Sequence, residues 1–315
     1  MLNKTIWLLW LQGWDSAPWL IKQVAESWEI NNPDWKIEYV TLGNLHKYVQ
    51  DVDYLYDEAK EISAAAKSDI IRLGLLKNHG GVWADATSLC MQPLNVWLEE
   101  AVKPAGLWMY HGNCGGMNPK NVDCKNGPAS WFLIAEKDSL MISKWKKACD
   151  EYWSDRTNAD EYFWIDKLFI ELLESDKEFE KMWTLVPHLY CELKEQSHSL
   201  FRYKMELSNQ EIKKVFLEKP PYVLKFWWKA WQENFPDVTS AGCKSSNGYY
   251  AIQMSKRKFV FKHKMLSKNS LVFHARMSIV NIQFRLGMFS MLPSMRIHLF
   301  IWEVKKAIKK IIRRA

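Results

Sequence analysis

Asp85 and Thr87 bring one carboxylate and one hydroxyl to the end of a short run that suits a strand, Val82-Trp83-Ala84. Residues i and i+2 of an extended chain point the same way, so we expect both side chains to face one spot. These oxygens suit a divalent cation, and a cation with few protein ligands keeps sites free for diphosphate oxygens. The same stretch also fits a Gly80-Gly81 helix stop, a core strand and a capping aspartate. By itself it leaves both interpretations open.

A second pair of charged residues lies upstream, in a segment whose pattern predicts a helix from about Asp57 to Asn78. Asp69 and Arg72 are three positions apart there, so they share one face of the helix. Such a pair is commonly a weak ion pair on the surface. The small residues at 64–66 would let this helix pack closely or admit a ligand. Asp69 and Arg72 are therefore candidates for binding as well.

The elements that must position these residues alternate between strand and helix patterns. We expect strands over 5–11 and 35–42, and helices over 17–29 and 44–52. This alternation predicts an α/β domain with a parallel sheet. Ligands of such sheets bind at the carboxyl ends of the strands. Trp10-Leu11-Gln12-Gly13 and Asp85-Ala86-Thr87 would both lie at that edge.

The charge of the 315-residue chain is concentrated near its end. Of the formal net charge of +7, most lies in residues 294–315, which hold seven Lys or Arg and one Glu. A nucleic-acid-binding protein would carry a basic face on its folded body, so this class is disfavoured. The six cysteines form no Cys-x-x-Cys pair, which argues against structural zinc and fits reduced thiols in a cytosolic chain.

The basic C-terminal segment has apolar residues at helical spacing, with cations at most other positions. The apolar set is Ile297, Phe300, Ile301, Val304, Ile308 and Ile311. The segment is too charged to span a bilayer and has the pattern of an interfacial helix. We expect it to hold the protein peripherally on an anionic membrane surface, the cytoplasmic inner face of the cell membrane. Docking on the protein body, or on a partner protein, is the other interpretation.

Several stretches, in this order, resemble glycosyltransferase family 32 and the capsular polysaccharide synthesis proteins. The central block, which is the sugar-nucleotide signature, is Ala66-Lys67-Ser68-Asp69-Ile70-Ile71-Arg72, Leu76 and Gly80-Gly81-Val82-Trp83-Ala84-Asp85-Ala86-Thr87. Weaker pieces are residues 6–14, Ser27-Trp28, Asn32-Pro33-Asp34-Trp35, 131–135, 162–166 and 221–229. The resemblance covers roughly residues 5–230.

The resemblance implies a GT-A type, Rossmann-like domain, which we place at 1–275, followed by a mainly helical, membrane-associating extension at 276–315. It implies transfer of a hexose from a nucleotide sugar, expected to be a UDP-sugar, to a growing surface or capsular glycan on a lipid-linked acceptor. Retention of anomeric configuration and a Mn²⁺ or Mg²⁺ cofactor are also implied. A catalytically weak carbohydrate- or lipid-surface-binding protein of the same fold is the alternative.

The resemblance also implies roles for the matching residues at the donor site. Asp85 would be the first acid of an Asp-X-Asp motif, acting in catalysis and binding the metal or ribose. Thr87 replaces the second acid and would complete the metal site with fewer charges. Asp69 and Arg72 would contact donor sugar hydroxyls and diphosphate.

Further candidates lie outside the central block. Trp10 would lie against the nucleotide base, with Gln12 as a second substrate-binding residue. Lys225, in a Lys-aromatic segment, is a candidate for a diphosphate contact. Asp166 follows the aromatic cluster Tyr162-Phe163-Trp164. It is a catalytic candidate that would stabilise the reacting carbon or orient the acceptor, although a solvent-facing helical aspartate fits the same sequence.

Overall fold

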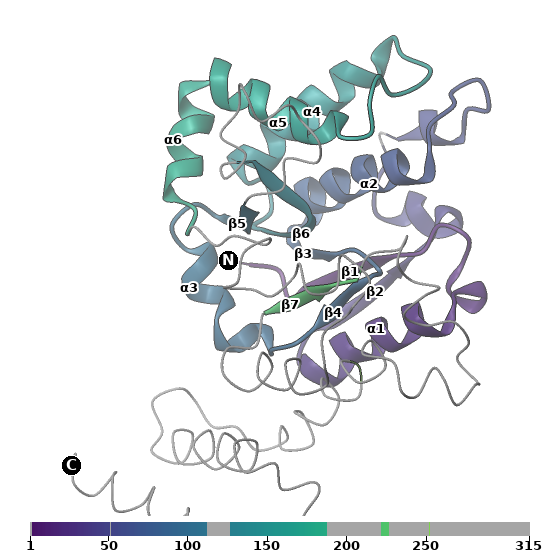
Figure 1. Cartoon of the computed structure of the whole chain (residues 1–315), viewed down its shortest axis with the longest axis vertical. Coiled ribbons are helices and arrows are strands. Elements are labelled where there is room, and N and C mark those ends of the chain that lie inside the picture. Colours follow the sequence, from purple (N-terminus) through teal and green to yellow (C-terminus); the bar gives the residue numbers. More distant parts are fainter. Residues whose placement is uncertain (1, 51, 112–126, 188–221, 227–251, 253–315) are drawn as a thin grey trace, which may run out of the picture.

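A computed structural model describes residues 2–50, 52–111, 127–187, 222–226 and 252. Its centre is a five-stranded sheet in the order β2-β1-β3-β6-β5 (Figure 1). The strands are β1 (Thr5–Leu9), β2 (Lys36–Val40), β3 (Gly81–Ala84), β5 (Leu107–His111) and β6 (Pro128–Ala135). Strand β1 pairs in parallel with β2 and β3, whereas β6 pairs antiparallel with β3 and β5.

The α/β class is confirmed, but the prediction of a parallel sheet holds for only three strands. Alternation of strand and helix stops after β3, and the following strand pairs need no helical crossover. The result is a mixed sheet between helices, as expected of a GT-A-like domain.

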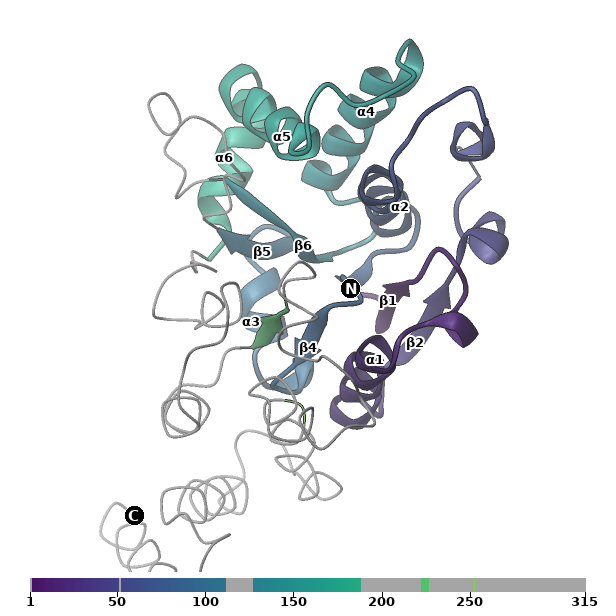
Figure 2. The ribbon, with the colours of Figure 1, turned by 45° about the vertical axis from the view of Figure 1, so that its right-hand side comes forward.

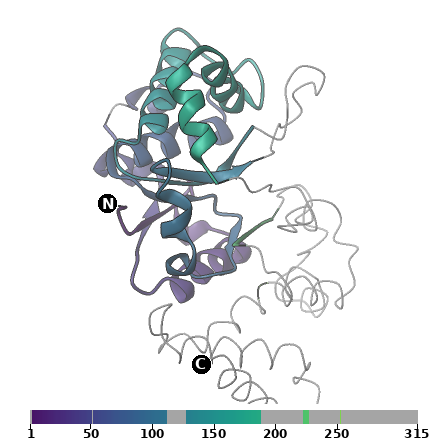
Figure 3. The same cartoon turned by 90° about the vertical axis from the view of Figure 1, so that its left-hand side faces the viewer.

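Helices cover both faces of the central sheet. Helices α2, α4, α5 and α6 lie on one side and α1 lies on the other (Figures 1 and 2). Their bounds are α1 (Trp19–Asn31), α2 (Ala64–His79), α3 (Leu98–Val102), α4 (Leu140–Ser154), α5 (Trp164–Ser175) and α6 (Lys177–Leu185). Seen from the side, the sheet separates α1 from the upper helices (Figure 3).

Local chemistry explains where the helices differ from their predicted bounds. Helix α2 begins seven residues later than expected, because the Ser63 side chain accepts from the Ala66 backbone N–H at 3.2 Å and caps it. The helix predicted over 44–52 is replaced by a 3₁₀ turn at Leu42–Lys47, and a second 3₁₀ turn follows at Asp53–Tyr56. The charged stretch 175–181, whose composition is typical of a turn, instead contains the start of α6. Asp176 caps α6 there, and Phe179 and Trp183 bury one face of that helix.

The connection from α2 into β3 depends on two glycines. Gly80 and Gly81 have φ of 67° and 102°, a region that side chains disfavour. A Cβ on Gly81 would lie 2.5 Å from the backbone oxygen of Thr5 in β1. The Trp7 indole donates to the Gly80 oxygen at 2.9 Å. These contacts fix where β3, and the residue that follows it, leaves the sheet.

A second, two-stranded sheet lies beside the first and joins distant parts of the chain. Its strands are β4 (Ser88–Cys90) and β7 (Val223–Lys225), which pair antiparallel with Ser88 opposite Lys225. The predicted boundary near residue 275, the segment 276–315 and the Gly- and Asn-rich segment 112–126 lie outside the described residues. Among the described helices, none is long and apolar enough to cross a membrane.

Candidate functional site

Asp85 lies at the carboxyl edge of the sheet, directly after β3. Its backbone N–H donates to the Trp131 oxygen at 2.9 Å, which extends the pairing of β3 with β6 by one residue. The Ser88 backbone N–H donates to the Asp85 backbone oxygen at 2.8 Å and closes a turn. The extended backbone that we assumed from Asp85 to Thr87 is therefore wrong, because a turn into β4 replaces it.

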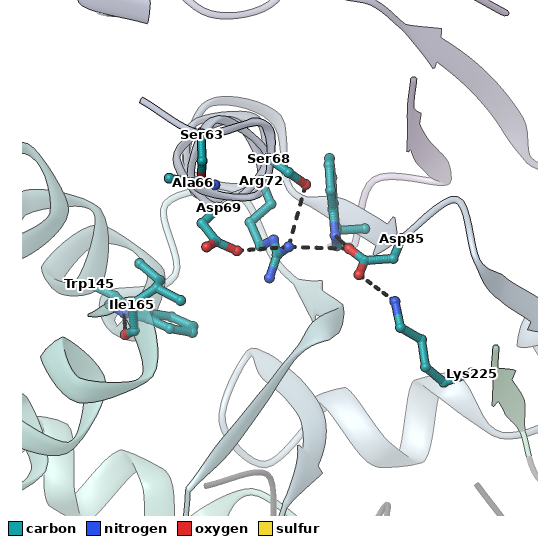
Figure 4. A network of polar contacts seen from close by, with 10 residues as sticks. Ser63, Ala66, Ser68, Asp69, Arg72, Asp85, Trp145, Ile165 and Lys225 are labelled. Carbon is teal, nitrogen blue, oxygen red and sulfur yellow. Dashed lines mark hydrogen bonds and ion pairs between the residues drawn. The ribbon is translucent and has the colours of Figure 1, made fainter. Parts of the chain in front are cut away.

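Three donors surround the Asp85 carboxylate. The Trp83 indole donates to Oδ1 at 2.9 Å, and the Arg72 Nη2 lies 3.2 Å from the same oxygen. The Lys225 Nζ donates to Oδ2 at 2.6 Å. Figure 4 shows Arg72 between two carboxylates, with Lys225 on the other side of Asp85. One carboxylate thus contacts two cations, one at each of its oxygens.

Arg72 and Asp69 come from one face of α2, as predicted, but the pair is not on the surface. Arg72 is 4% exposed and Asp69 is 8% exposed. The Arg72 Nη2 lies 2.9 Å from the Asp69 Oδ1, and its guanidinium carbon lies 5.4 Å from the Trp83 ring centroid. Among the described residues, the buried Nε of Arg72 has no hydrogen-bond partner. This arginine therefore keeps unused donor capacity beside Asp85.

Lys225 reaches the site because β7 pairs with the strand that follows the Asp85 turn. The Phe226 N–H donates to the Thr87 oxygen at 2.9 Å and continues that ladder. The ammonium also lies 5.7 Å from the Trp131 ring centroid. The structure thus joins Lys225, Asp85, Arg72 and Asp69, all of which were candidates from sequence.

Helix α1 anchors the other side of the turn. The Trp28 indole donates to the Ser88 oxygen at 2.8 Å, and the Cys90 N–H donates to the Ser27 hydroxyl at 2.9 Å. The Asn32 side-chain oxygen accepts from the Leu94 N–H at 2.8 Å. These residues belong to the weaker pieces of the resemblance, and sequence reasoning gave them no role. Their polar groups hold the segment that carries Asp85 and Thr87.

Asp166 is buried, with 1% exposed, so the solvent-facing interpretation is wrong. It lies in the first turn of α5, which the Trp145 indole fixes by donating to the Ile165 oxygen at 3.0 Å. Burial, and then the charge of Asp69, raise the pKa of Asp166 well above its usual value, while Arg72 and a hydrogen bond with Ser130 act in the opposite direction. Oδ1 of Asp166 has no hydrogen-bond partner among the described residues. Burial therefore favours the neutral form of Asp166.

The charged groups of the cluster shift one another's pKa values. Burial raises the pKa of Asp69 to about 6, although Arg72 opposes the shift. Burial acts to raise the pKa of Asp85 too, but Lys225, Arg72 and its hydrogen bonds hold the value below the usual range. Burial lowers the pKa of Lys225 against the effect of Asp85. The ring of Tyr162 is largely exposed. Partial burial nevertheless raises the pKa of its hydroxyl, and the charges of Asp69 and Asp85 raise it further.

Trp10 and Gln12 lie at the same edge of the sheet, directly after β1. Trp10 is half-buried, and its backbone N–H donates to the Val40 backbone oxygen at 3.0 Å. Gln12 is exposed. The contacts around Asp85 described above come from other residues. The roles of Trp10 in base binding and of Gln12 in substrate binding stay predictions.

The predicted binding of Mn²⁺ or Mg²⁺ by Asp85 and Thr87 stays a prediction, and the donors around Asp85 do not fit it as they are arranged. Both Asp85 oxygens already accept from cations. The described residues contain no group of three or more His, Cys, Asp or Glu side chains placed to hold a metal ion. A divalent cation takes about six oxygen ligands and is held through carboxylates.

Comparison with known proteins places this cluster in a family. A model of the capsular polysaccharide synthesis proteins matches residues 1–240, which include every candidate site residue named above. The chain belongs to the capsular polysaccharide synthesis protein family. Within this family's matched region, Asp69, Arg72 and Asp85 come from the central block that carried the resemblance, and Lys225 from its late segment.

Relatives with assigned names are similar over part of their length. A putative glycosyltransferase, HOC1, of Saccharomyces cerevisiae is 27% identical over 112 residues, 34% of this chain and 28% of that protein. The O-glycosyltransferase braB of Annulohypoxylon truncatum is 21% identical over 169 residues, 50% of this chain and 39% of that protein. The chain thus spans well under half the length of these relatives. A solved structure, the PaToxG glycosyltransferase, has a TM-score of 0.39 and 15% identity, covering 70% of this chain and 88% of that one.

Proposed function

We propose that the chain is a glycosyltransferase that moves a hexose from a nucleotide sugar to a growing surface or capsular glycan. The observation that carries the proposal is the pair of cations, Arg72 and Lys225, held on Asp85 at the carboxyl edge of the sheet. Family membership and the names of the relatives support transferase chemistry. In an α/β sheet this edge is where a nucleotide ligand binds.

The reaction breaks the bond between the sugar and a diphosphate, and negative charge develops on the departing oxygen. Fixed positive groups aimed at that charge stabilise the transition state. In this proposal Arg72 and Lys225 contact the diphosphate, and Asp85 keeps both cations in place. Asp69 holds Arg72 from its other side and faces the donor sugar.

Asp166 has a separate role in the proposal, because burial favours its protonated form. A neutral carboxyl group donates one hydrogen bond and adds no charge to the cluster. It orients a hydroxyl of the sugar donor or of the acceptor. Transfer passes through an oxocarbenium-like state, and retention of configuration is part of the proposal.

The acceptor and the location rest on the sequence of residues 294–315. We propose a UDP-sugar donor, a lipid-linked glycan acceptor and peripheral attachment to the inner face of the cell membrane. The basic, amphipathic pattern supports binding to an anionic surface. A lipid-linked acceptor would be presented at that surface.

A donor panel tests the proposal. The full chain is incubated with UDP-, GDP- and CDP-sugars, with Mn²⁺ or with EDTA, and release of nucleoside diphosphate is measured alongside the unfolding temperature. One class of donor is expected to raise the unfolding temperature by mass action and to be hydrolysed slowly. Absence of both effects for every donor, with and without Mn²⁺, would contradict the proposal.

A catalytically weak carbohydrate-binding protein is the second candidate, and Thr87 in place of an acid favours it. Such a protein would bind a glycan and release no nucleoside diphosphate from any donor. The same panel, repeated with a glycan acceptor, separates the two functions.

A further inference from the structure

The two cations beside Asp85 stand where the family resemblance expects a metal ion. Lys225 and Arg72 occupy opposite oxygens of that carboxylate, at 2.6 and 3.2 Å. A divalent cation entering here would have to displace them or lie against two like charges. Both oxygens of Asp85 are therefore already occupied by cationic side chains, unlike the oxygens of an empty metal site.

We infer that Lys225, with Arg72, serves as the built-in cation of the site, so that this chain binds a nucleoside diphosphate without a divalent metal ion. The inference rests on the proposed function and deepens it by naming what neutralises the diphosphate.

Charge accounting supports this assignment. Thr87 lacks the negative charge that a second acid would bring, and Lys225 adds a positive charge that contacts Asp85. Asp69, Arg72, Asp85 and Lys225 are neutral as a group when all are ionised, whereas a metal site needs an excess of negative ligands.

Hydrogen-bond donors of Arg72 and Lys225 that have no described partner also support this inference. Arg72 is 4% exposed, and its Nε has no hydrogen-bond partner among the described residues. A buried charged donor left without a partner is costly, and a phosphate oxygen would remove that cost. The Lys225 ammonium has three N–H donors, and Asp85 is the one carboxylate described in contact with it.

The position of Lys225 is fixed by backbone pairing. Residues 223–225 form a ladder with 88–90, and the Phe226 N–H donates to the Thr87 oxygen at 2.9 Å. The ammonium is thus tied to the turn that holds Asp85. Preorganised charge of this kind needs no rearrangement when the ligand arrives.

Equilibrium titration of the full chain with UDP, GDP, CDP and inorganic pyrophosphate tests the inference. Each titration is done in excess EDTA and again in excess Mn²⁺. For the nucleotide that binds, affinity in EDTA is expected to lie within about twofold of that in Mn²⁺. Removing one charge-assisted hydrogen bond costs about tenfold in affinity, so Lys225→Met should bind about tenfold more weakly in EDTA. Mn²⁺ should then restore part of the affinity of that variant, because Lys225 no longer occupies Oδ2 of Asp85.

Two further variants serve as controls for this titration. Lys225→Arg retains a cation and is expected to bind in EDTA, which guards against a folding defect in Lys225→Met. Lys147→Met removes an exposed lysine on α4, whose side chain is 78% exposed, and should change nothing.

The outcomes separate this inference from the proposed function. Binding by the wild type that requires Mn²⁺ would overturn the inference and leave the glycosyltransferase proposal standing. Wild-type affinity of Lys225→Met in EDTA would also overturn it. Absence of binding under every condition would overturn both.

Discussion

Arg72 is the residue on which two carboxylates depend, since its Nη2 contacts both Asp69 and Asp85. The sequence placed Arg72 and Asp69 on one helix face but could not tell a surface pair from a buried one. Burial changes the expected cost of mutation, because removing one partner of a buried pair leaves the others uncompensated. Mutation of Arg72 is therefore expected to cost more stability than mutation of an arginine in a surface ion pair.

Arg72→Met should lower the free energy of unfolding by about 3–5 kcal/mol, the range for breaking a buried ion pair. Arg156→Met is the matched control, because Arg156 pairs with Asp160 at the surface. It should cost far less, because an exposed ion pair is screened by solvent and contributes little to stability. Urea unfolding of both variants measures the difference, and equal costs would show that the Arg72 pair contributes no more than a surface pair.

Asp166 makes stability depend on pH with a definite sign. The pKa of Asp166 is raised in the folded state, so the folded protein binds its proton more tightly than the unfolded chain does. This contribution is fully present below the unfolded pKa, about 4, and is lost as pH rises through the folded value.

Asp166→Asn removes that titration and keeps the shape of the neutral carboxyl group. The variant should gain stability relative to the wild type as pH rises from about 4 towards neutrality. Urea unfolding at several pH values tests this, and a stability of the variant relative to the wild type that stays constant or falls as pH rises would argue against a protonated Asp166. Donor hydrolysis by the variant is an independent check, because loss of activity would indicate that a charged carboxylate is required.

At the scale of elements, the passage from α2 to β3 sets the position of Asp85. Gly81→Ala would place a Cβ 2.5 Å from the backbone oxygen of Thr5 in the neighbouring strand β1. Gly13 has a similar φ of 96° but nothing within 4 Å, so Gly13→Ala carries the backbone strain alone.

We expect Gly13→Ala to cost about 1–2 kcal/mol, in line with a disfavoured backbone conformation. Gly81→Ala should cost clearly more, because the steric overlap is added to that strain. Thermal and urea unfolding measure both, and a smaller loss for Gly81→Ala would contradict the close packing of β1 against β3.

The elements also show what the sequence could predict. Local patterns were enough for α2, for β3 and for the shared face of Asp69 and Arg72. The pairing of Lys225 with Asp85 spans 140 positions and depends on β7 joining β4, which no local pattern encodes. Trp83 could have been found, since Trp83 and Asp85 are two positions apart in an extended segment. The direction of β6 could not, because no local pattern encodes its antiparallel pairing with β3 and β5.

At the scale of the whole molecule, the charge map separates a near-neutral body from a basic end. Removing residues 295–315 should abolish sedimentation with anionic vesicles, because each cation near such a surface contributes on the order of 1 kcal/mol. Donor hydrolysis in solution should persist, since Asp85 and its partners lie elsewhere in the chain. Unchanged vesicle binding by the shortened chain would rule out this anchor, and neutral vesicles serve as the control.

The most direct test of the account is nucleoside diphosphate release by Asp85→Asn with the donor that the panel identifies. Asparagine keeps an oxygen for the Trp83 indole but loses the charge that holds Arg72 and Lys225 together. A small displacement of such groups costs about 100-fold in rate, so release should fall by at least that factor while unfolding stays cooperative. Asp34→Asn, at an exposed position, should release at the wild-type rate. Wild-type release by Asp85→Asn would contradict the account.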